Sequence, residues 1–167
     1  MFSDRLRYAT VELENLDCFH SLVQDKHVRR YLMDGNLFPL EWSKERVRES
    51  QSLFARRGVG LWLVTHAATD ELVGFCGFME IPSIHPDPQL VYALFERCTG
   101  LGYATEMART SIARARGQGF TQILASVDEV NADSCRVLEK LGFERVGTQH
   151  GNFGPMFVLR LANDRSI

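Results

Sequence analysis

The segment between residues 90 and 119 places two glycines between an expected strand and an expected helix. Residues 90–94 are apolar and suit a short strand, and Gly100 and Gly102 follow. Apolar or small residues then recur at intervals of three and four, which predicts an amphipathic helix. Such a turn collects backbone N–H groups and the positive end of a helix dipole, so it favours an anion. Taken alone, the glycine pair fits an ordinary tight turn equally well.

The rest of the chain predicts strands and helices in the order β-α-α-β-β-β-α-β-α-β-β. Strands are expected at residues 5–8, 61–65, 72–78, 90–94, 122–127, 144–147 and 156–161, and helices at 16–23, 43–58, 104–117 and 131–141. Three prolines between residues 81 and 88 predict a loop, because proline lacks a backbone donor. This order predicts an α/β (α+β) fold in one domain over residues 1–167, with a mixed sheet and helices on its faces.

Length and composition limit the class of function. The 167 residues are 45% hydrophobic, enough for one substantial core. Nineteen basic and 21 acidic residues give a net charge of −2, so we expect neither nucleic acid nor membrane as a partner. The chain lacks an apolar run long enough to span a bilayer and a secretory signal, so the expected location is cytoplasmic. Its 4 cysteines form no C-x-x-C pair, and we expect no metal.

Two common nucleotide motifs fit the glycine segment poorly. A dinucleotide fingerprint needs a third small residue, Gly or Ala, where this chain has Thr105, and a P-loop needs a lysine that is absent from this segment. A nicotinamide oxidoreductase is therefore disfavoured. What remains is a phosphate-bearing ligand that one helix terminus and one strand edge can hold.

Longer motifs carry a more specific signal. From Arg5-Leu6-Arg7 onward, most of the chain resembles the Gcn5-related N-acetyltransferase (GNAT) superfamily, specifically its RimJ/RimL-type branch. The motifs that carry the resemblance are Val73-Gly74-Phe75, Tyr92-Ala93-Leu94, Gly100-Leu101-Gly102-Tyr103-Ala104-Thr105-Glu106, Asn131-Ala132-Asp133-Ser134 and Val137-Leu138-Glu139-Lys140-Leu141-Gly142-Phe143. The resemblance implies a mostly antiparallel sheet of about seven strands in which the fourth and fifth strands splay apart.

The resemblance also implies a reaction and its partners. The expected activity is transfer of an acetyl group from acetyl-CoA to a primary amine, either a protein N-terminus or a small molecule, through a tetrahedral intermediate. A homodimer is compatible with this expectation. The alternative is a non-catalytic acyl-CoA-binding or sensor module, because Leu124 stands at a strand position where many relatives carry Glu.

The resemblance assigns the coenzyme to the loop after the fourth strand and to the splayed strand edge. The expected coenzyme-binding residues are Leu94, Phe95, Thr99, Gly100, Leu101, Gly102, Tyr103, Ala104, Thr105 and Asn131. Leu94 and Phe95 would offer backbone groups to the pantetheine arm. Thr99 stands where the family carries Arg or Gln, so backbone donors would have to bind the diphosphate without that side chain.

Acetylation of an amine needs a base for the ammonium, donors for the oxyanion and a proton for the departing thiolate. The resemblance implies that Asn131 and Ser134 face the thioester, and Ser134 is the expected proton donor. By spacing alone the two fit a helix cap and its neighbour equally well. Glu80 or a chain of waters is the candidate base. Tyr92 is interpreted as a packing residue.

Overall fold

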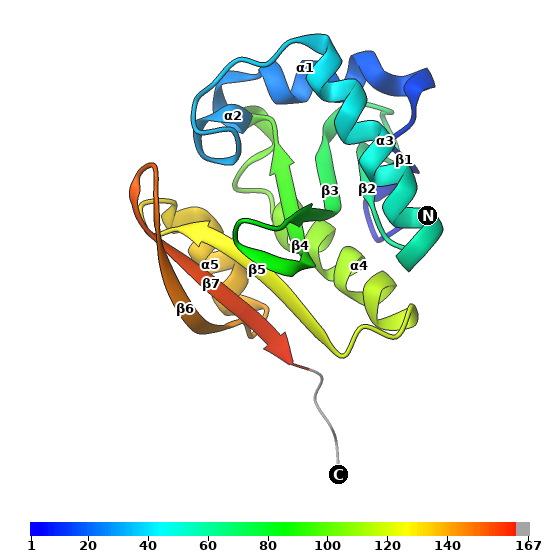
Figure 1. Ribbon diagram of the computed structural model, residues 1–167. Helices are drawn as coiled ribbons and strands as arrows, with labels where there is room; N and C mark the ends of the chain where they lie inside the picture. The colour runs from blue at the N-terminus through cyan, green and yellow to red at the C-terminus, as the bar shows by residue number, and fades with distance from the viewer. Residues whose placement is uncertain (163–167) are drawn as a thin grey trace.

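The computed structural model describes residues 1–162, in which a seven-stranded sheet is flanked by helices (Figure 1). The expected domain, 1–167, extends beyond this part. The strands are β1 (Leu6–Thr10), β2 (Leu61–His66), β3 (Leu72–Ile81), β4 (His85–Leu94), β5 (Gln122–Asp128), β6 (Glu144–Gly151) and β7 (Gly154–Ala162). The α-helices are α1 (Leu16–Gln24), α2 (Lys26–Leu32), α3 (Leu40–Arg57), α4 (Tyr103–Gly117) and α5 (Ala132–Lys140), and short 3-10 turns lie at Leu13–Asn15 and Glu96–Cys98.

The sheet has the strand order β1-β2-β3-β4-β5-β7-β6. All neighbours are antiparallel except β4 and β5, which are parallel and share a single registered pair, Gln89 with Leu124. Beyond that pair the two strands diverge toward their carboxyl ends, as their arrowheads show in Figure 1. The predicted mixed, mostly antiparallel sheet with splayed fourth and fifth strands is confirmed.

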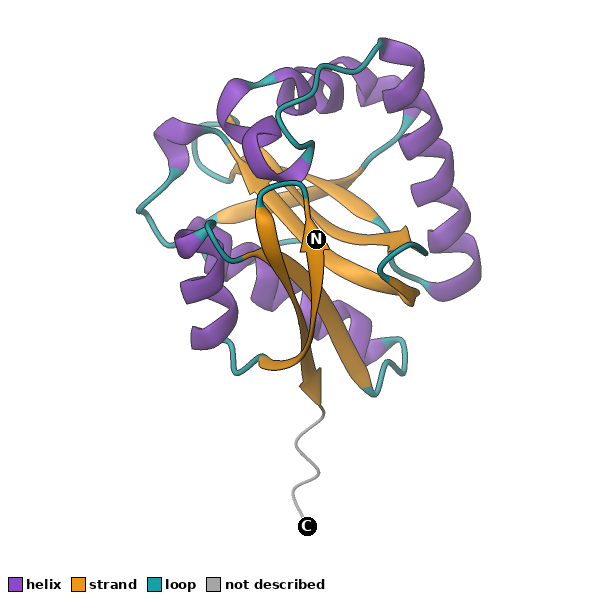
Figure 2. Ribbon diagram, turned by 60° about the vertical axis from the view of Figure 1, so that its left-hand side comes forward, coloured by secondary structure: helices purple, strands orange, loops and turns teal. Residues whose placement is uncertain are grey.

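Each face of the sheet is covered by helices (Figure 2) and has its own buried core. One core includes Phe78 and Leu90 with Met107 of α4 and Leu138 of α5. The other includes Phe19 of α1 and Val47 of α3, packed against the opposite face. In β2 and β4, consecutive residues alternate between the two cores because side chains of a strand point to opposite faces in turn.

The expected loop at residues 81–88 is wrong over much of its length. β3 continues to Ile81 and β4 already begins at His85, so the connection between them is short. Pro86 and Pro88 stand at alternate positions, so both missing donors fall on the same side of β4. A strand tolerates proline where the absent N–H has no ladder partner, and the sequence pattern did not reveal this. The β6–β7 hairpin is likewise longer than predicted.

Two helix predictions also need correction. The short helix α2 was not expected, although Asp25 caps it by accepting hydrogen bonds from the amides of His27 and Val28. α3 begins at Leu40, after Pro39, rather than at Ser43. The Ser43 side chain is buried inside the helix, where its hydroxyl contacts Nδ1 of His20 at 2.8 Å. In residues 1–162 no helix combines the length and apolar character needed to cross a bilayer.

Candidate functional site

The glycine loop leaves a row of backbone donors open at the start of α4. Gly100 and Gly102 have φ values of 73° and 82°, a left-handed conformation that glycine adopts without strain. The next amide, that of Glu106, donates to Gly102 O at 3.1 Å. Within residues 1–162, none of the six amides from Gly100 to Thr105 donates a hydrogen bond to the protein. With the positive end of the α4 dipole, these amides are suited to bind an anion.

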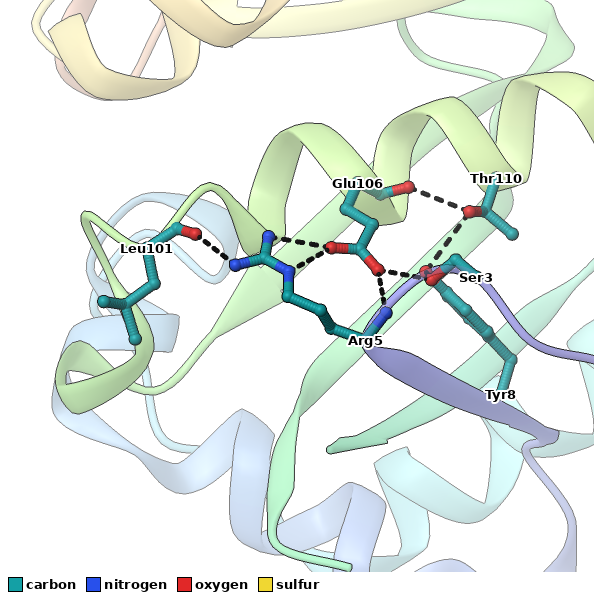
Figure 3. A network of polar contacts seen from close by, with 6 residues as sticks. All are labelled: Ser3, Arg5, Tyr8, Leu101, Glu106 and Thr110. Carbon is teal, nitrogen blue, oxygen red and sulfur yellow. Dashed lines mark hydrogen bonds and ion pairs between the residues drawn. The ribbon is translucent and has the colours of Figure 1, made fainter. Parts of the chain in front are cut away.

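Residues of the N-terminal segment contact this loop and the first turn of α4 (Figure 3). Arg5 lies just before β1, and its side chain reaches both the carbonyl of Leu101 and the carboxylate of Glu106. Ser3 donates to the same carboxylate at 2.6 Å. Burial alone would raise the pKa of Glu106, but the hydrogen bonds from Ser3 and Arg5 outweigh burial and hold it below its usual value. Glu106 is therefore an ionised anchor in the first turn of α4.

The divergence of β4 from β5 exposes a strand edge next to the loop. The amide of Phe95 donates to Val73 O at 3.1 Å and so belongs to the β3–β4 ladder. Because backbone groups of a strand alternate in direction, Leu94 and Tyr92 direct their N–H and C=O groups toward β5. β5 has already separated from β4 at that level. The structure therefore places Leu94, but not the amide of Phe95, at the open edge.

A hydroxyl pair bridges β4 and α5 across this divergence. The phenol of Tyr92 and the hydroxyl of Ser134 are 2.8 Å apart, and both side chains are half-buried. Asn131 caps α5 by accepting a hydrogen bond from the Ser134 amide at 3.3 Å. Burial raises the pKa of Tyr92 to about 12, so the phenol keeps its proton at neutral pH. Tyr92, which the sequence suggested as a packing residue, packs against the core and also forms a hydrogen bond with Ser134.

A half-buried carboxylate, Asp128, ends β5 at the point where β5 has separated from β4. We call the opening between the carboxyl ends of these two strands the mouth. Its backbone carbonyl accepts the amide of Asn131 at 2.9 Å, which ties it to the start of α5. Val127 belongs to the core under α4 and α5, so the Asp128 side chain points to the face that α1, α2 and α3 cover. Burial raises the pKa of Asp128, and the charge of Asp34 raises it further.

The β6–β7 hairpin reaches across toward the α2–α3 connection near Asp128. Asn152 donates to Asp34 Oδ2 at 2.7 Å, and the rings of Phe153 and Tyr31 pack edge to face. A Cβ on Gly151 would lie 3.0 Å from Asp128 Oδ1, so glycine keeps room for that carboxylate. The hairpin therefore closes one side of the mouth.

Two predicted residues are not brought into this arrangement by their side chains. Glu80 is bound by Arg56 at 2.8 Å and borders a separate groove of about 280 Å³ that Ser50 of α3 also lines. Thr99 donates its hydroxyl to Glu96 O at 2.7 Å, so that donor is engaged. Sequence reasoning overlooked Arg5 and Asp128 as functional candidates, and a charged residue close to a recognised motif was the available signal.

A helix terminus with open amides beside two diverging parallel strands defines the class, a fold of CoA-dependent acetyltransferases. Residues 5–144 match the family model described as an acetyltransferase (GNAT) domain, and the chain belongs to that family. The expected superfamily and enzyme class are thereby confirmed.

Individual relatives agree with the family match. The chain is 24% identical over 152 residues to p20 of Bacillus licheniformis, described as an uncharacterized N-acetyltransferase; the match covers 88% of this chain and 83% of p20. The ribosomal-protein-S5-alanine acetyltransferase of Vibrio fischeri superposes with a TM-score of 0.78 at 16% identity, covering 99% of this chain and 97% of that one. The spermidine N-acetyltransferase of Vibrio cholerae, in complex with CoA and spermine, has a TM-score of 0.77 at 16% identity, with 96% of both chains covered. These two likenesses establish the fold.

Proposed function

We propose that this protein transfers the acetyl group of acetyl-CoA to a primary amine by direct attack of the amine on the thioester. The observation that carries the proposal is the row of open amides from Gly100 to Thr105, next to the separated edge of β4. Six donors and a helix dipole suit a diphosphate, which has several acceptor oxygens and negative charge. The edge of β4 suits an amide-bearing arm such as pantetheine.

The coenzyme contacts follow from this placement. The diphosphate binds the amides of residues 100–105, and Leu94 supplies backbone groups to the pantetheine arm. The amides of Leu94 and Tyr92 point into the same gap, so either can donate to the oxyanion of the tetrahedral intermediate. Asn131 positions Ser134 through its cap on α5.

The departing thiolate takes its proton from the Ser134–Tyr92 pair in this mechanism. As the C–S bond breaks, the Ser134 hydroxyl donates its proton to sulfur and takes the phenolic proton of Tyr92, 2.8 Å away. Solvent water then returns a proton to the Tyr92 oxygen, which completes the cycle. A phenol with a pKa of about 12 holds its proton across the neutral range, so the relay starts in the correct state.

Asp128 is our proposed proton acceptor for the incoming ammonium, in place of Glu80. An amine with an ordinary pKa of about 8 to 10 is mostly charged in water, so it must lose a proton before attack. The raised pKa of Asp128 makes it a stronger base than an ordinary carboxylate. Glu80 is less suitable because Arg56 neutralises it outside the mouth. A water can carry the proton between the amine and Asp128.

A covalent acetyl-cysteine route is less well supported. Cys135 lies next to Ser134, but burial raises the pKa of its thiol. Because the thiolate is the nucleophilic form, a raised pKa leaves little reactive sulfur at neutral pH. Direct transfer needs no such species.

The test combines binding with turnover. Titration calorimetry with acetyl-CoA measures coenzyme affinity, and thiol release with peptides bearing a free N-terminus, polyamines and other small amines measures transfer. We expect binding and turnover on at least one amine class. Failure to bind acetyl-CoA would end the proposal, whereas binding without turnover on any amine would favour the acyl-CoA sensor. Mass spectrometry of the amine confirms the acetyl product.

A further inference from the structure

Arg5 lies far from residues 100–106 in the sequence, but its side chain contacts three of them. Its Nη1 donates to Leu101 O at 2.9 Å, and its Nε donates to Glu106 Oε2 at 2.9 Å. Its guanidinium carbon lies 4.5 Å from the ring centroid of Tyr103, the first residue of α4. The Arg5 backbone amide adds a hydrogen bond of 2.9 Å to Glu106 Oε1. Figure 3 shows the side chain between the loop and the first turn of α4.

From these contacts we infer that Arg5 is a positioning residue that sets the direction of the diphosphate-binding amides. This inference rests on the proposed function. The carbonyl of Leu101 and the N–H of Gly102 belong to one planar trans peptide, so they point in opposite directions. When Arg5 holds the carbonyl on its own side of the loop, the Gly102 N–H must face the other side, where no protein acceptor meets it in residues 1–162.

The second part of the inference concerns charge. Glu106 sits in the first turn of α4, and its side chain is only 13% exposed, so an unpaired carboxylate there would repel a diphosphate. Arg5 neutralises it through Nη2 at 2.8 Å while 44% of the Arg5 side chain stays exposed. Thr99 brings no positive charge to the loop, and its hydroxyl is bound to Glu96 O. Arg5 thus supplies from the N-terminal segment a cation that the loop itself lacks.

The chain offers a matched control two residues away. Arg7 is equally exposed, at 42% of its side chain, and forms an ion pair with Asp70 in the β2–β3 turn rather than with the loop. Replacing Arg7 removes the same charge from the same end of β1 without touching Leu101 or Glu106. A second matched element is the substrate: S-acetylpantetheine carries the reactive thioester but no diphosphate.

The experiment compares wild type, Arg5→Met, Arg5→Lys and Arg7→Met with both thioesters at a saturating amine concentration. We expect Arg5→Met to raise KM for acetyl-CoA about tenfold with kcat little changed, because charged hydrogen bonds that orient the loop are lost. Its activity with S-acetylpantetheine should equal that of wild type. Arg5→Lys keeps the positive charge, but an ammonium group lacks the planar guanidinium geometry that binds the Leu101 carbonyl and the Glu106 carboxylate together. We therefore expect an intermediate KM. Arg7→Met should leave both substrates unaffected.

The outcomes separate the inference from the proposed function. An unchanged acetyl-CoA KM in Arg5→Met, or equal losses with both thioesters, would overturn the positioning role, the second result indicating a general structural role. If the wild-type protein does not bind acetyl-CoA, the proposed function and this inference are both overturned. Calorimetric affinity for CoA gives the same comparison without turnover, so a slow amine substrate does not obscure the result.

Discussion

The two sides of the site are assembled differently. On the coenzyme side, the groups expected to bind the diphosphate are consecutive amides from Gly100 to Thr105, and distant residues such as Arg5 only brace them. The other side, where we propose that the amine enters, comprises Asp128, the α2–α3 connection and the β6–β7 hairpin; we call it the acceptor side. Its contacts join segments far apart in the chain. Asn152 and Asp34 are 118 positions apart, and Gln149 reaches the carbonyl of Ile84 across 65 positions.

This difference shows where the two halves can vary. A loop that binds through its backbone depends on conformation, so few substitutions preserve it. A mouth made of side chains from α2, the α2–α3 connection and the β6–β7 hairpin can change residue by residue while the fold persists. We therefore expect variants on the coenzyme side to change affinity for one ligand, and variants on the acceptor side to change the choice of amine. The following variants test this division, starting with the chemistry between the two sides.

Asp128→Asn should have the largest effect. We expect kcat to fall roughly 100-fold at neutral pH, because the proposed base is lost. Thermal stability, in contrast to kcat, should not fall. The raised pKa means that the folded state prefers the protonated carboxyl, so stability conferred by that proton is complete at acidic pH and lost as pH rises through the folded pKa. The asparagine variant escapes this loss, and its melting temperature at neutral pH should equal or exceed that of wild type.

The control for that variant is Asp133→Asn on α5, which removes an 88% exposed carboxylate paired with Arg136. It should leave both turnover and melting temperature close to wild type. Measurement of kcat/KM against pH together with thermal melts covers all three proteins. Wild-type turnover in Asp128→Asn would contradict the assignment of the base.

Ser134→Ala and Tyr92→Phe should each lower kcat by about 10- to 100-fold while coenzyme affinity changes little, because each interrupts proton delivery to the thiolate. Stopped-flow thiol release and calorimetry measure the two quantities separately. Tyr8→Phe is the matched control, since burial also raises the pKa of that phenol to about 12 but its hydroxyl contacts Ser3 and Thr110. If Tyr92→Phe behaves like Tyr8→Phe, the relay is not used.

Gly100→Ala tests the coenzyme side alone. A Cβ at Gly100 would meet no protein atom within 4 Å, so its methyl group would project into open space next to the amides proposed to bind the diphosphate. We expect coenzyme affinity to fall about tenfold, in addition to a strain cost of roughly 1 kcal/mol for a side chain at positive φ. Gly119→Ala, with φ of 87° and similarly open space at the other end of α4, should show the strain cost without the affinity loss.

Asn152→Ala should have the smallest effect, and that effect should be confined to KM for the amine. Loss of its hydrogen bond to Asp34 loosens the hairpin over the mouth, and one such bond corresponds to about a 2- to 10-fold change. We expect KM for the amine to rise while KM for acetyl-CoA stays constant. Asn36→Ala removes a second amide of the α2–α3 connection, which donates to the Met33 carbonyl at 3.2 Å, and so separates loss of the hairpin contact from a change within the connection itself. A larger rise in KM for acetyl-CoA than in KM for the amine would contradict the proposed division between the two sides.

Several elements of the fold were predictable because their signals are local. The glycine loop, the amphipathic α4 and the capped α5 follow from residues within one or two turns of each other. The β3–β4 connection and the start of α3 were less predictable. Prolines usually indicate a loop and serine usually indicates a helix N-cap, and neither preference holds at these positions. Pro86 and Pro88 nevertheless lie in β4, and Ser43 is buried within α3, where it contacts His20.

The sequence by itself determined that a glycine turn suited to an anion lies between a central strand and a helix, since glycine conformation and helix polarity are properties of neighbouring residues. Only the tertiary structure decided that Tyr92 meets Ser134, that Arg5 holds the loop and that Asp128 lies at the mouth. Those contacts depend on strand order, register and the divergence of β4 from β5, which arise when distant segments pack on a shared core.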